Sequence, residues 1–255
     1  MPETAVSAPG KAIWADLATP DLEKSKDFYS KLFGWEPQVL GPEAGGYVLF
    51  SLNGKTVAAV APAQEGQFPA WSVYFGTEDA DATAKAVESA GGKVIVPPFD
   101  VLDTGRMAVF QDPAGAFFSV WQPNKMKGFD VVDEPNTFSW AELNTKDTAT
   151  AEAFYPKVFG WGMKKNPGGD NGPAYTEWQI DGKSIGGEMD TTTFQMEVPP
   201  FWLVYFAVAD IDGAASKVKE LGGQVMNGPS DYPGGKFAVL MDSNNTVFGL
   251  LQGEQ

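Results

Sequence analysis

Two carboxyl groups in this chain stand beside tryptophans at the same spacing. Asp16 comes two residues after Trp14, and Glu142 comes two residues after Trp140. Residues two apart on a β-strand point to the same face, and both stretches alternate as strands do. A carboxyl group held against an indole has its pKa raised, which suits a general acid or base, or an anchor for a cationic ligand. The alternative is that each acid pairs with lysine or with backbone amides inside a core.

The residue types that are missing narrow the chemistry. The 255 residues include no histidine and no cysteine, which removes the usual general base at neutral pH, the thiolate nucleophile and the commonest ligands of zinc and iron. The formal net charge of −15 disfavours nucleic acid and anionic membranes as partners. We expect a cytoplasmic protein, because the start of the chain resembles no signal peptide and no segment is apolar enough to span a membrane.

Both tryptophan and acid pairs belong to a longer repeat. The stretch 14–35, WADLATPDLEKSKDFYSKLFGW, returns at 140–161 as WAELNTKDTATAEAFYPKVFGW, an offset of 126 residues. A period this long indicates duplicated domains rather than a solenoid. We therefore predict modules at residues 1–122 and 137–255, joined by a proline-bounded linker at 123–136 that lies outside both.

The elements that must position these residues follow from the patterns in each module. Residues 12–19 alternate as a strand, and apolar residues then recur at helical spacing until Gly34 ends a helix. Asn53-Gly54 predicts a hairpin turn between strands at 47–52 and 56–62, because both positions tolerate positive φ. The remaining strands and a second helix make each module a doubled βαβββ unit. Open sheet edges predict extensive packing between the modules.

The chain resembles the vicinal oxygen chelate superfamily of glyoxalases, extradiol dioxygenases and bleomycin-binding proteins. The resemblance lies in the helix sequence DLEKSKDFYSKLFGW, in the DPAG turn near the end of the first module and in the paired βαβββ plan. The sequence is most similar to the two-module actinobacterial glyoxalase-like proteins. This resemblance implies an α+β fold of tandem paired βαβββ modules, each a U-shaped mixed sheet with its helices on the convex side. It also implies that the strand faces carrying Asp16 and Glu142 line concave cavities.

The resemblance further implies where a metal would be held. The three positions fall on Trp14, Ser72 and Ser119 in the first module and on Trp140, Leu203 and Gly249 in the second. An indole has no lone pair for a metal, and the other residues do not assemble an N/O ligand set. We predict neither a metal nor a cofactor.

Residues an even number of positions apart on a strand share a face, which places three further aromatic side chains toward the cavities: Tyr74, Tyr205 and Trp121. Such a lining binds flat or apolar ligands through contact area, stacking and cation–π interaction. The other matched tryptophans are expected to pack helices on sheets: Trp35, Trp161, Trp71 and Trp202. For the two first-strand indoles the alternative is that they simply close a former metal cavity.

Three charged residues are additional candidates for ligand binding. Arg106, the only arginine, could anchor an anionic ligand, with a surface salt bridge as the alternative. Glu177 and Glu188 stand where the first module has apolar residues, which makes the second cavity the more polar. Like charges near Glu142 would keep a proton bound to higher pH, so the second module is the favoured pocket. If a hard cation binds, these carboxylates are its candidate ligands.

Together these features favour a metal-independent protein that binds or sequesters an aromatic or apolar small molecule, as a monomer or homodimer. A cofactor-free lyase, isomerase or hydrolase that uses Asp16 or Glu142 as acid or base is the first alternative. A glyoxalase- or dioxygenase-type metalloenzyme is the second, and the missing ligands argue against it.

Overall fold

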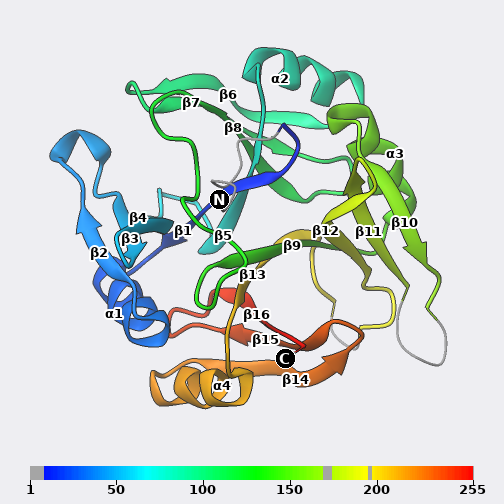
Figure 1. The fold of residues 1–255 in the computed structure, drawn as a ribbon. Coiled ribbons are helices and arrows are strands. Elements are labelled where there is room, and N and C mark those ends of the chain that lie inside the picture. Colours follow the sequence, from blue (N-terminus) through cyan, green and yellow to red (C-terminus); the bar gives the residue numbers. More distant parts are fainter. Residues whose placement is uncertain (1–8, 169–173, 195–196, 255) are drawn as a thin grey trace.

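The computed structural model describes residues 9–168, 174–194 and 197–254. These residues form two eight-stranded mixed sheets and four α-helices, with one sheet and two helices from each half of the chain (Figure 1). The predicted α+β architecture of tandem βαβββ modules is confirmed. None of the helices in this described part is long and apolar enough to cross a lipid bilayer.

The first module consists of two βαβββ units that pair side by side. One unit contains β1 (Ala12–Thr19), α1 (Leu22–Phe33), β2 (Glu36–Val39), β3 (Val48–Leu52) and β4 (Lys55–Pro62), with a 3₁₀ turn at Pro42–Ala44. The other contains β5 (Ala70–Gly76), α2 (Ala80–Ser89), β6 (Lys93–Val101), β7 (Gly105–Gln111) and β8 (Phe117–Pro123). The sheet order β2-β3-β4-β1-β5-β8-β7-β6 places the first strands of both units, β1 and β5, antiparallel at the centre.

The second module repeats this plan element by element. Its first unit contains β9 (Phe138–Thr145), α3 (Thr148–Phe159), β10 (Gly162–Asn166), β11 (Tyr175–Ile180) and β12 (Lys183–Asp190). Its second contains β13 (Phe201–Ala207), α4 (Ile211–Glu220), β14 (Gln224–Tyr232), β15 (Gly235–Met241) and β16 (Val247–Gly253). The strand order, β10-β11-β12-β9-β13-β16-β15-β14, matches that of the first module. The duplication in the sequence is therefore a duplication of the fold.

Local signals set the ends of these elements. The side chain of Asp21 caps α1 by accepting from the backbone N–H of Lys24 at 3.0 Å. Gly34 then ends the helix at a φ of 74°, a left-handed conformation that glycine adopts without strain. The predicted hairpin at Asn53-Gly54 is confirmed, with φ values of 53° and 76° between β3 and β4.

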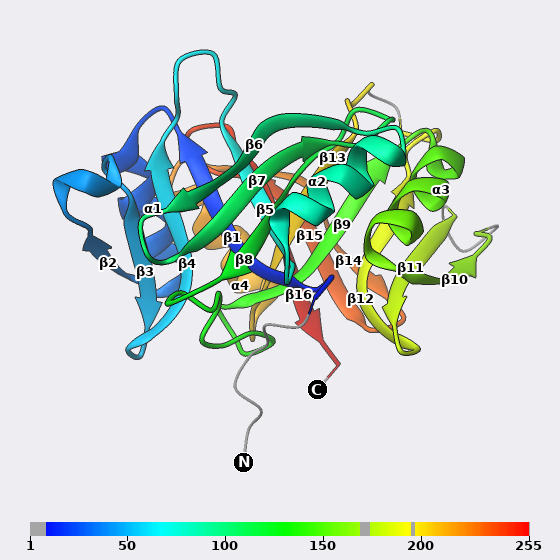
Figure 2. The ribbon, with the colours of Figure 1, turned by 90° about the horizontal axis from the view of Figure 1, so that it is seen from above.

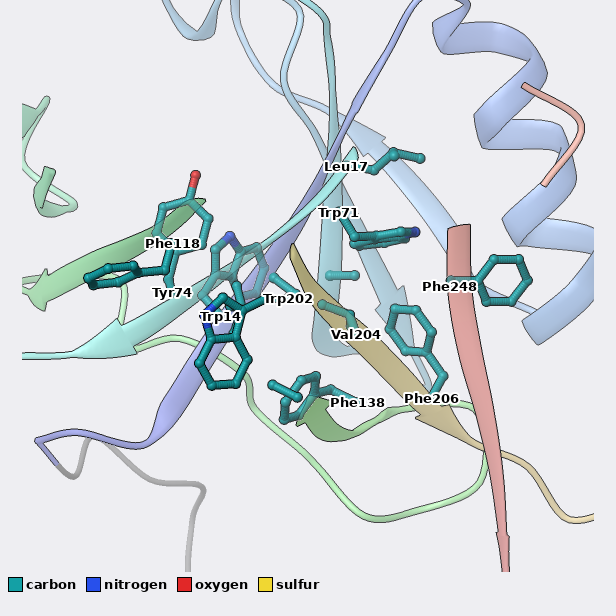
Figure 3. Packing of buried hydrophobic residues seen from close by; sticks show 14 of the residues in the cluster. Trp14, Leu17, Trp71, Tyr74, Phe118, Phe138, Trp202, Val204, Phe206 and Phe248 are labelled. Carbon is teal, nitrogen blue, oxygen red and sulfur yellow. The ribbon is translucent and has the colours of Figure 1, made fainter. Parts of the chain in front are cut away.

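The two sheets pack on each other through their helix-bearing faces. Trp71 of β5 lies 5.0 Å from Phe206 of β13, measured between ring centres (Figure 3). Phe75 of β5 lies 5.0 Å from Trp202 of β13 by the same measure. Helix α2 contacts α3, as Figures 1 and 2 both show, and α1 contacts α4. The predicted extensive packing between the modules is confirmed. The prediction that the modules pack by covering each other's open sheet edges is wrong. The outer strands remain at the sheet edges, because the large apolar faces gain more from burial than the edges do.

A hydrogen-bonded relay crosses this interface. The indole N–H of Trp71 donates to the hydroxyl of Tyr29 at 2.9 Å, and that hydroxyl donates to Asp242 of the second module at 3.0 Å. Tyr29 is fully buried, so its hydroxyl depends on these two partners. Asp242 in turn accepts from the backbone N–H groups of its own turn, which ties the tyrosine of one module to the turn of the other.

The same relay exists in the reverse direction. Trp202 donates to the hydroxyl of Tyr155 at 2.9 Å, and that hydroxyl donates to Asp112 of the first module at 2.9 Å. The Phe-Tyr pair of the repeat and the aspartate of the late turn therefore serve the interface between the modules.

The tryptophans that end the repeat make a second reciprocal contact. The indole N–H of Trp35 donates to the carbonyl of Asn136 at 2.8 Å, just before β9. That of Trp161 donates to the carbonyl of Gly10 at 3.0 Å, just before β1. Each module thus holds the entry to the other's first strand. These indoles are buried, as are Trp71 and Trp202, which confirms their predicted role in packing.

The segment 123–136 does not lie outside both modules as expected. Phe129 and Val131 are buried, and the backbone N–H of Phe129 donates to the carbonyl of Ile13 at 2.8 Å. Its ring stacks on Phe138 with 4.8 Å between ring centres. The cause is hydrophobic, since the apolar residues of the segment gain free energy by covering the end of β1. The module boundaries themselves stay a prediction.

Replacing Tyr29 by phenylalanine should lower the free energy of unfolding by about 1–3 kcal/mol, because the change leaves buried groups of Trp71 and Asp242 without a partner. Urea unfolding followed by circular dichroism measures this loss. Tyr232→Phe is the control, because Tyr232 is 40% exposed. Equal stability of the two variants would show that the relay contributes nothing.

Candidate functional site

The first candidate site is centred on Asp16 in β1. The hydroxyls of Tyr47 and Tyr74 both donate to its Oδ2 atom, at 2.9 and 3.0 Å. The indole N–H of Trp14 donates to the Tyr47 hydroxyl at 2.9 Å. Asp16 is partly exposed, and within the described residues its Oδ1 atom accepts no hydrogen bond. The site therefore combines an oriented carboxyl group with one oxygen available to a donor from outside the protein.

Burial dominates the electrostatics of Asp16. It raises the pKa of this carboxyl to about 6, while the hydrogen bonds from Tyr47 and Tyr74 act to lower it. Burial and the nearby carboxylate also hold the pKa of both tyrosines well above the ordinary value, so both remain hydrogen-bond donors. A carboxyl group with a pKa near 6 can take or give a proton close to neutral pH. Its partners are tyrosines rather than the lysine or backbone amides of the alternative interpretation.

The second candidate site repeats this arrangement around Glu142 in β9. The Oε1 atom accepts from the hydroxyl of Tyr205 and from the side-chain amide of Asn144, both at 3.2 Å. Trp140 donates to the hydroxyl of Tyr175 at 2.9 Å. Glu142 is buried, and burial raises its pKa, while hydrogen bonds from Tyr175, Asn144 and Tyr205 act to lower it. This carboxyl group accepts from one amide and one tyrosine, whereas Asp16 accepts from two tyrosines, and Glu142 is more buried than Asp16.

Three members of these clusters were not singled out from the sequence: Tyr47, Tyr175 and Asn144. Tyr47 and Tyr175 occupy matching places in the repeat, so their recurrence was a usable signal. Asn144 lies two residues beyond Glu142, and strand parity alone puts both on one face. What the sequence did not contain is the pairing of β1 with β4, which brings the end of β3 close to Asp16.

Family comparison accounts for the duplicated plan. The profile of the Glyoxalase/Bleomycin resistance protein/Dioxygenase superfamily matches residues 11–120 and again residues 137–248. The chain belongs to this superfamily. Among its relatives, the anthracycline biosynthesis protein DnrV of Streptomyces peucetius is 42% identical over 261 residues, covering 96% of this chain and 94% of DnrV. The candidate glyoxylase CFP32 of Mycobacterium bovis is 38% identical over 261 residues, covering 99% of this chain and 98% of CFP32.

Solved structures of the superfamily share the architecture. The Mn(II)-bound glyoxalase from Novosphingobium aromaticivorans has a TM-score of 0.68 at 19% identity, over 96% of this chain and 82% of that one. The 2,2',3-trihydroxybiphenyl 1,2-dioxygenase from Sphingomonas wittichii has a TM-score of 0.68 at 15% identity, over 97% and 92%. At such low identity the likeness concerns the fold alone.

The residues at the superfamily's metal positions do not fit a metal. Ser72 lies opposite Asp16 in the sheet, and the Trp14 indole offers no lone pair. In the second module, a Cβ atom on Gly249 would lie 2.0 Å from the Tyr205 ring, so that ring fills the space next to the third position. Within the described ranges, no three acidic, histidine or cysteine side chains gather in the way a metal site requires. No chemical step is therefore derived through a metal.

Two of the predicted binding residues lie outside the carboxyl clusters. The indole N–H of Trp121 donates to the carbonyl of Met126 at 2.9 Å, and its ring is buried. Arg106 pairs with Asp81 at 2.9 Å and with Asp100 at 3.0 Å. The salt-bridge alternative thus describes Arg106 in this structure.

Glu177 and Glu188 do not gather around Glu142. Strand register puts Glu177 on the same face as Glu142, but Glu177 pairs with Lys164 at 2.9 Å, and its hydrogen bonds to Ser184 and Lys164 lower its pKa. Glu188 lies opposite Leu143 in the sheet and faces the other side, toward α3. The expected group of three acids does not form, because Glu188 faces the other side of the sheet and Glu177 pairs with Lys164.

Glu188 is instead a buried acid in the core, close to Glu152 of α3. It is 1% exposed, and within the described part of the chain neither carboxyl oxygen has a hydrogen-bond partner. Burial, followed by repulsion from Glu152, raises its pKa to about 8. The first module has Val60 at this place in its own sheet, so the charge is not required by the fold.

Two clefts formed by the described residues are lined by residues outside the carboxyl clusters. One, of about 470 Å³, is lined by Asp231, Tyr232, Lys236, Gln252 and Glu254. Burial and the Glu142 carboxylate are the main causes that raise the pKa of Tyr205, and Tyr232 of this cleft adds a smaller contribution. The other, of about 450 Å³, lies between Ala114 of the first module and residues 145–147 and 197–200 of the second.

Replacing Glu188 by glutamine should stabilise the protein more at pH 8 than at pH 5. The native state binds this proton more tightly than the unfolded chain, so stability falls as pH rises from about 4.5 to about 8. At about 1.4 kcal/mol for each pKa unit, the gain from pH 5 to pH 8 should be about 2–4 kcal/mol. Thermal and urea unfolding at both pH values measure it.

Glu177→Gln is the matched control for this change. The Glu177 carboxyl group is partly exposed and pairs with Lys164, and its pKa is lowered. The substitution should therefore give no increase in the free energy of unfolding as pH rises. A pH-independent effect at Glu188 would mean that its carboxyl group has an ordinary pKa in the native state and is solvated.

Proposed function

We propose that this superfamily member is a metal-independent binding protein for aromatic or apolar small molecules, and that the second module holds the ligand. The observation that carries the proposal is the partly exposed indole of Trp140 beside the buried carboxyl group of Glu142. An exposed indole supplies apolar area and a π-face, and a fixed carboxyl group supplies direction. The side chains at the metal positions support a role that does not depend on a metal.

The relatives support an aromatic ligand. DnrV is named for anthracycline biosynthesis, and an anthracycline is a flat fused-ring aromatic that carries an amino sugar. A flat ring suits stacking on an indole, and a protonated amine suits an acidic protein through cation–π and carboxylate contacts. The cleft near Tyr232, with Asp231 and Glu254 in its lining, offers acidic groups for a basic substituent. We therefore include polycyclic aromatic compounds with a basic group in the proposed ligand class.

A second candidate function is cofactor-free proton transfer by Asp16. It is favoured by one arrangement in the first module, where both tyrosines donate to Oδ2 while Oδ1 accepts no hydrogen bond from the described residues. A partly exposed carboxyl group with a pKa of about 6 has the proton affinity of a general base or acid. Tyr47 and Tyr74 would orient the group and stabilise its charged form.

Replacing Trp140 by alanine should weaken binding of an anthracycline at least tenfold, about 1.4 kcal/mol, because the stacking surface is lost. Titration followed by ligand fluorescence measures the affinity. Phe68→Ala is the control, because Phe68 is 86% exposed and lies outside both clusters, and it should leave the affinity unchanged. An excess of EDTA should also change nothing. Equal losses in both variants, or loss of binding with EDTA, would contradict the proposal.

Replacing Tyr47 by phenylalanine should raise the pKa of Asp16 further above about 6, since the carboxylate loses a donor that stabilises its charged form. Carbon-13 NMR of labelled aspartate follows the titration, and Asp16→Asn identifies the signal by removing it. For the second candidate function, proton exchange of carbon acids in D₂O should rise through the same pKa and vanish in Asp16→Asn. A carboxyl group that titrates near the ordinary aspartate value would remove the basis for this candidate.

A further inference from the structure

The first-strand tryptophans are equivalent in the duplication but differ in their surroundings. Each indole N–H donates to a tyrosine hydroxyl at 2.9 Å, Trp14 to Tyr47 and Trp140 to Tyr175. Trp14 is only 2% exposed, whereas Trp140 is partly exposed. Both indole N–H groups therefore make the same hydrogen bond, and the two tryptophans differ in which residues cover their ring faces.

The cover on Trp14 is a residue of the segment between the modules. The ring of Phe129 lies 5.4 Å from the Trp14 ring with a tilt of 41°, a distance at which aromatic pairs attract. Among the described residues no aromatic ring lies against Trp140 in this way. One module thus supplies its own aromatic partner, and the other presents the same indole without one.

Phe129 is fixed in this position by its neighbours. Its N–H donates to Ile13, and the N–H of Asp130 donates to the carbonyl of Thr56 at 2.9 Å, while the N–H of Thr56 donates to the Asp130 carboxylate at 2.7 Å. Gly128 has a φ of 110°, and a Cβ atom there would lie 2.2 Å from the Ile13 carbonyl oxygen. Only glycine permits so close an approach. The linker is therefore held to β1 and β4 by backbone and side-chain hydrogen bonds.

We propose that Phe129 occupies on Trp14 the place that the aromatic ring of a ligand takes on Trp140. The first module is closed by its own linker, the second leaves Trp140 partly exposed without an aromatic cover from the described residues, and each chain binds one flat aromatic molecule. This inference rests on the proposed function for the site and adds to it the reason why only one of two equivalent modules binds. The acidic surroundings, with Glu142 on the same strand face, select neutral or cationic rings over anionic ones.

The test is a set of four proteins titrated with 2-naphthol by equilibrium dialysis: the wild type, Trp140→Ala, Phe129→Ala and the double variant. We expect one 2-naphthol site in the wild type and none in Trp140→Ala. We expect two sites in Phe129→Ala and one in the double variant, because removal of the phenyl ring exposes Trp14. A double variant that is folded by circular dichroism and binds no 2-naphthol would overturn the proposal, as would a wild type with two sites. If the wild type binds none and Phe129→Ala binds one, the closure by Phe129 stands and the proposed function of the second module fails.

A measurement on the wild type avoids any loss of folding in the variants. Hydroxyl-radical labelling with mass spectrometry should oxidise Trp140 at least fivefold faster than Trp14. Binding of 2-naphthol should slow oxidation of Trp140 relative to the exposed Phe68, which corrects for radical scavenging. Equal rates for the two indoles, or no selective protection of Trp140, would overturn the proposal. In Phe129→Ala, which removes the cover from Trp14, Trp14 should become protected by 2-naphthol as well.

Discussion

The architecture depends on two tyrosine hydroxyls buried between the modules. Tyr29 and Tyr155 each accept from a tryptophan of their own module and donate to an aspartate of the other. A buried hydroxyl without partners costs free energy, and so does a buried carboxylate. Each module therefore satisfies groups that the other cannot satisfy alone. The aromatic layer between the sheets adds non-directional stabilisation, while the relays fix how the modules are oriented.

This orientation has a consequence for chemistry. The helix-bearing faces of both sheets pack in the interface between the modules, and Asp16 and Glu142 lie on the opposite faces. The same scaffold in solved relatives includes a Mn(II)-bound glyoxalase. Here the equivalent face is filled by tryptophan and tyrosine side chains, and Tyr205 packs directly on Gly249.

Duplication also allowed the two faces to diverge. Asp16 is held by two tyrosines and keeps one oxygen without a donor from the described residues, whereas Glu142 gains Asn144 and becomes more buried. Trp14 is covered by Phe129, whereas Trp140 is partly exposed. An accessible carboxyl group and an accessible indole are therefore found in different modules. Acid–base chemistry suits the first arrangement and aromatic binding suits the second.

The sequence by itself determined the duplication, the doubled βαβββ plan, the strand faces of Asp16 and Glu142 and the absence of a metal-ligand set at the superfamily positions, because all of these follow from local periodicity and residue type. It did not reveal the short strands β2 and β10, whose residues are all exposed and so carry no apolar pattern. Only the tertiary structure decided that Tyr47 and Tyr175 complete the clusters, that Glu188 faces the core and that Phe129 covers Trp14. Each of these depends on strand register or on contacts between residues distant in the chain, and local patterns contain no information about which distant partner is chosen.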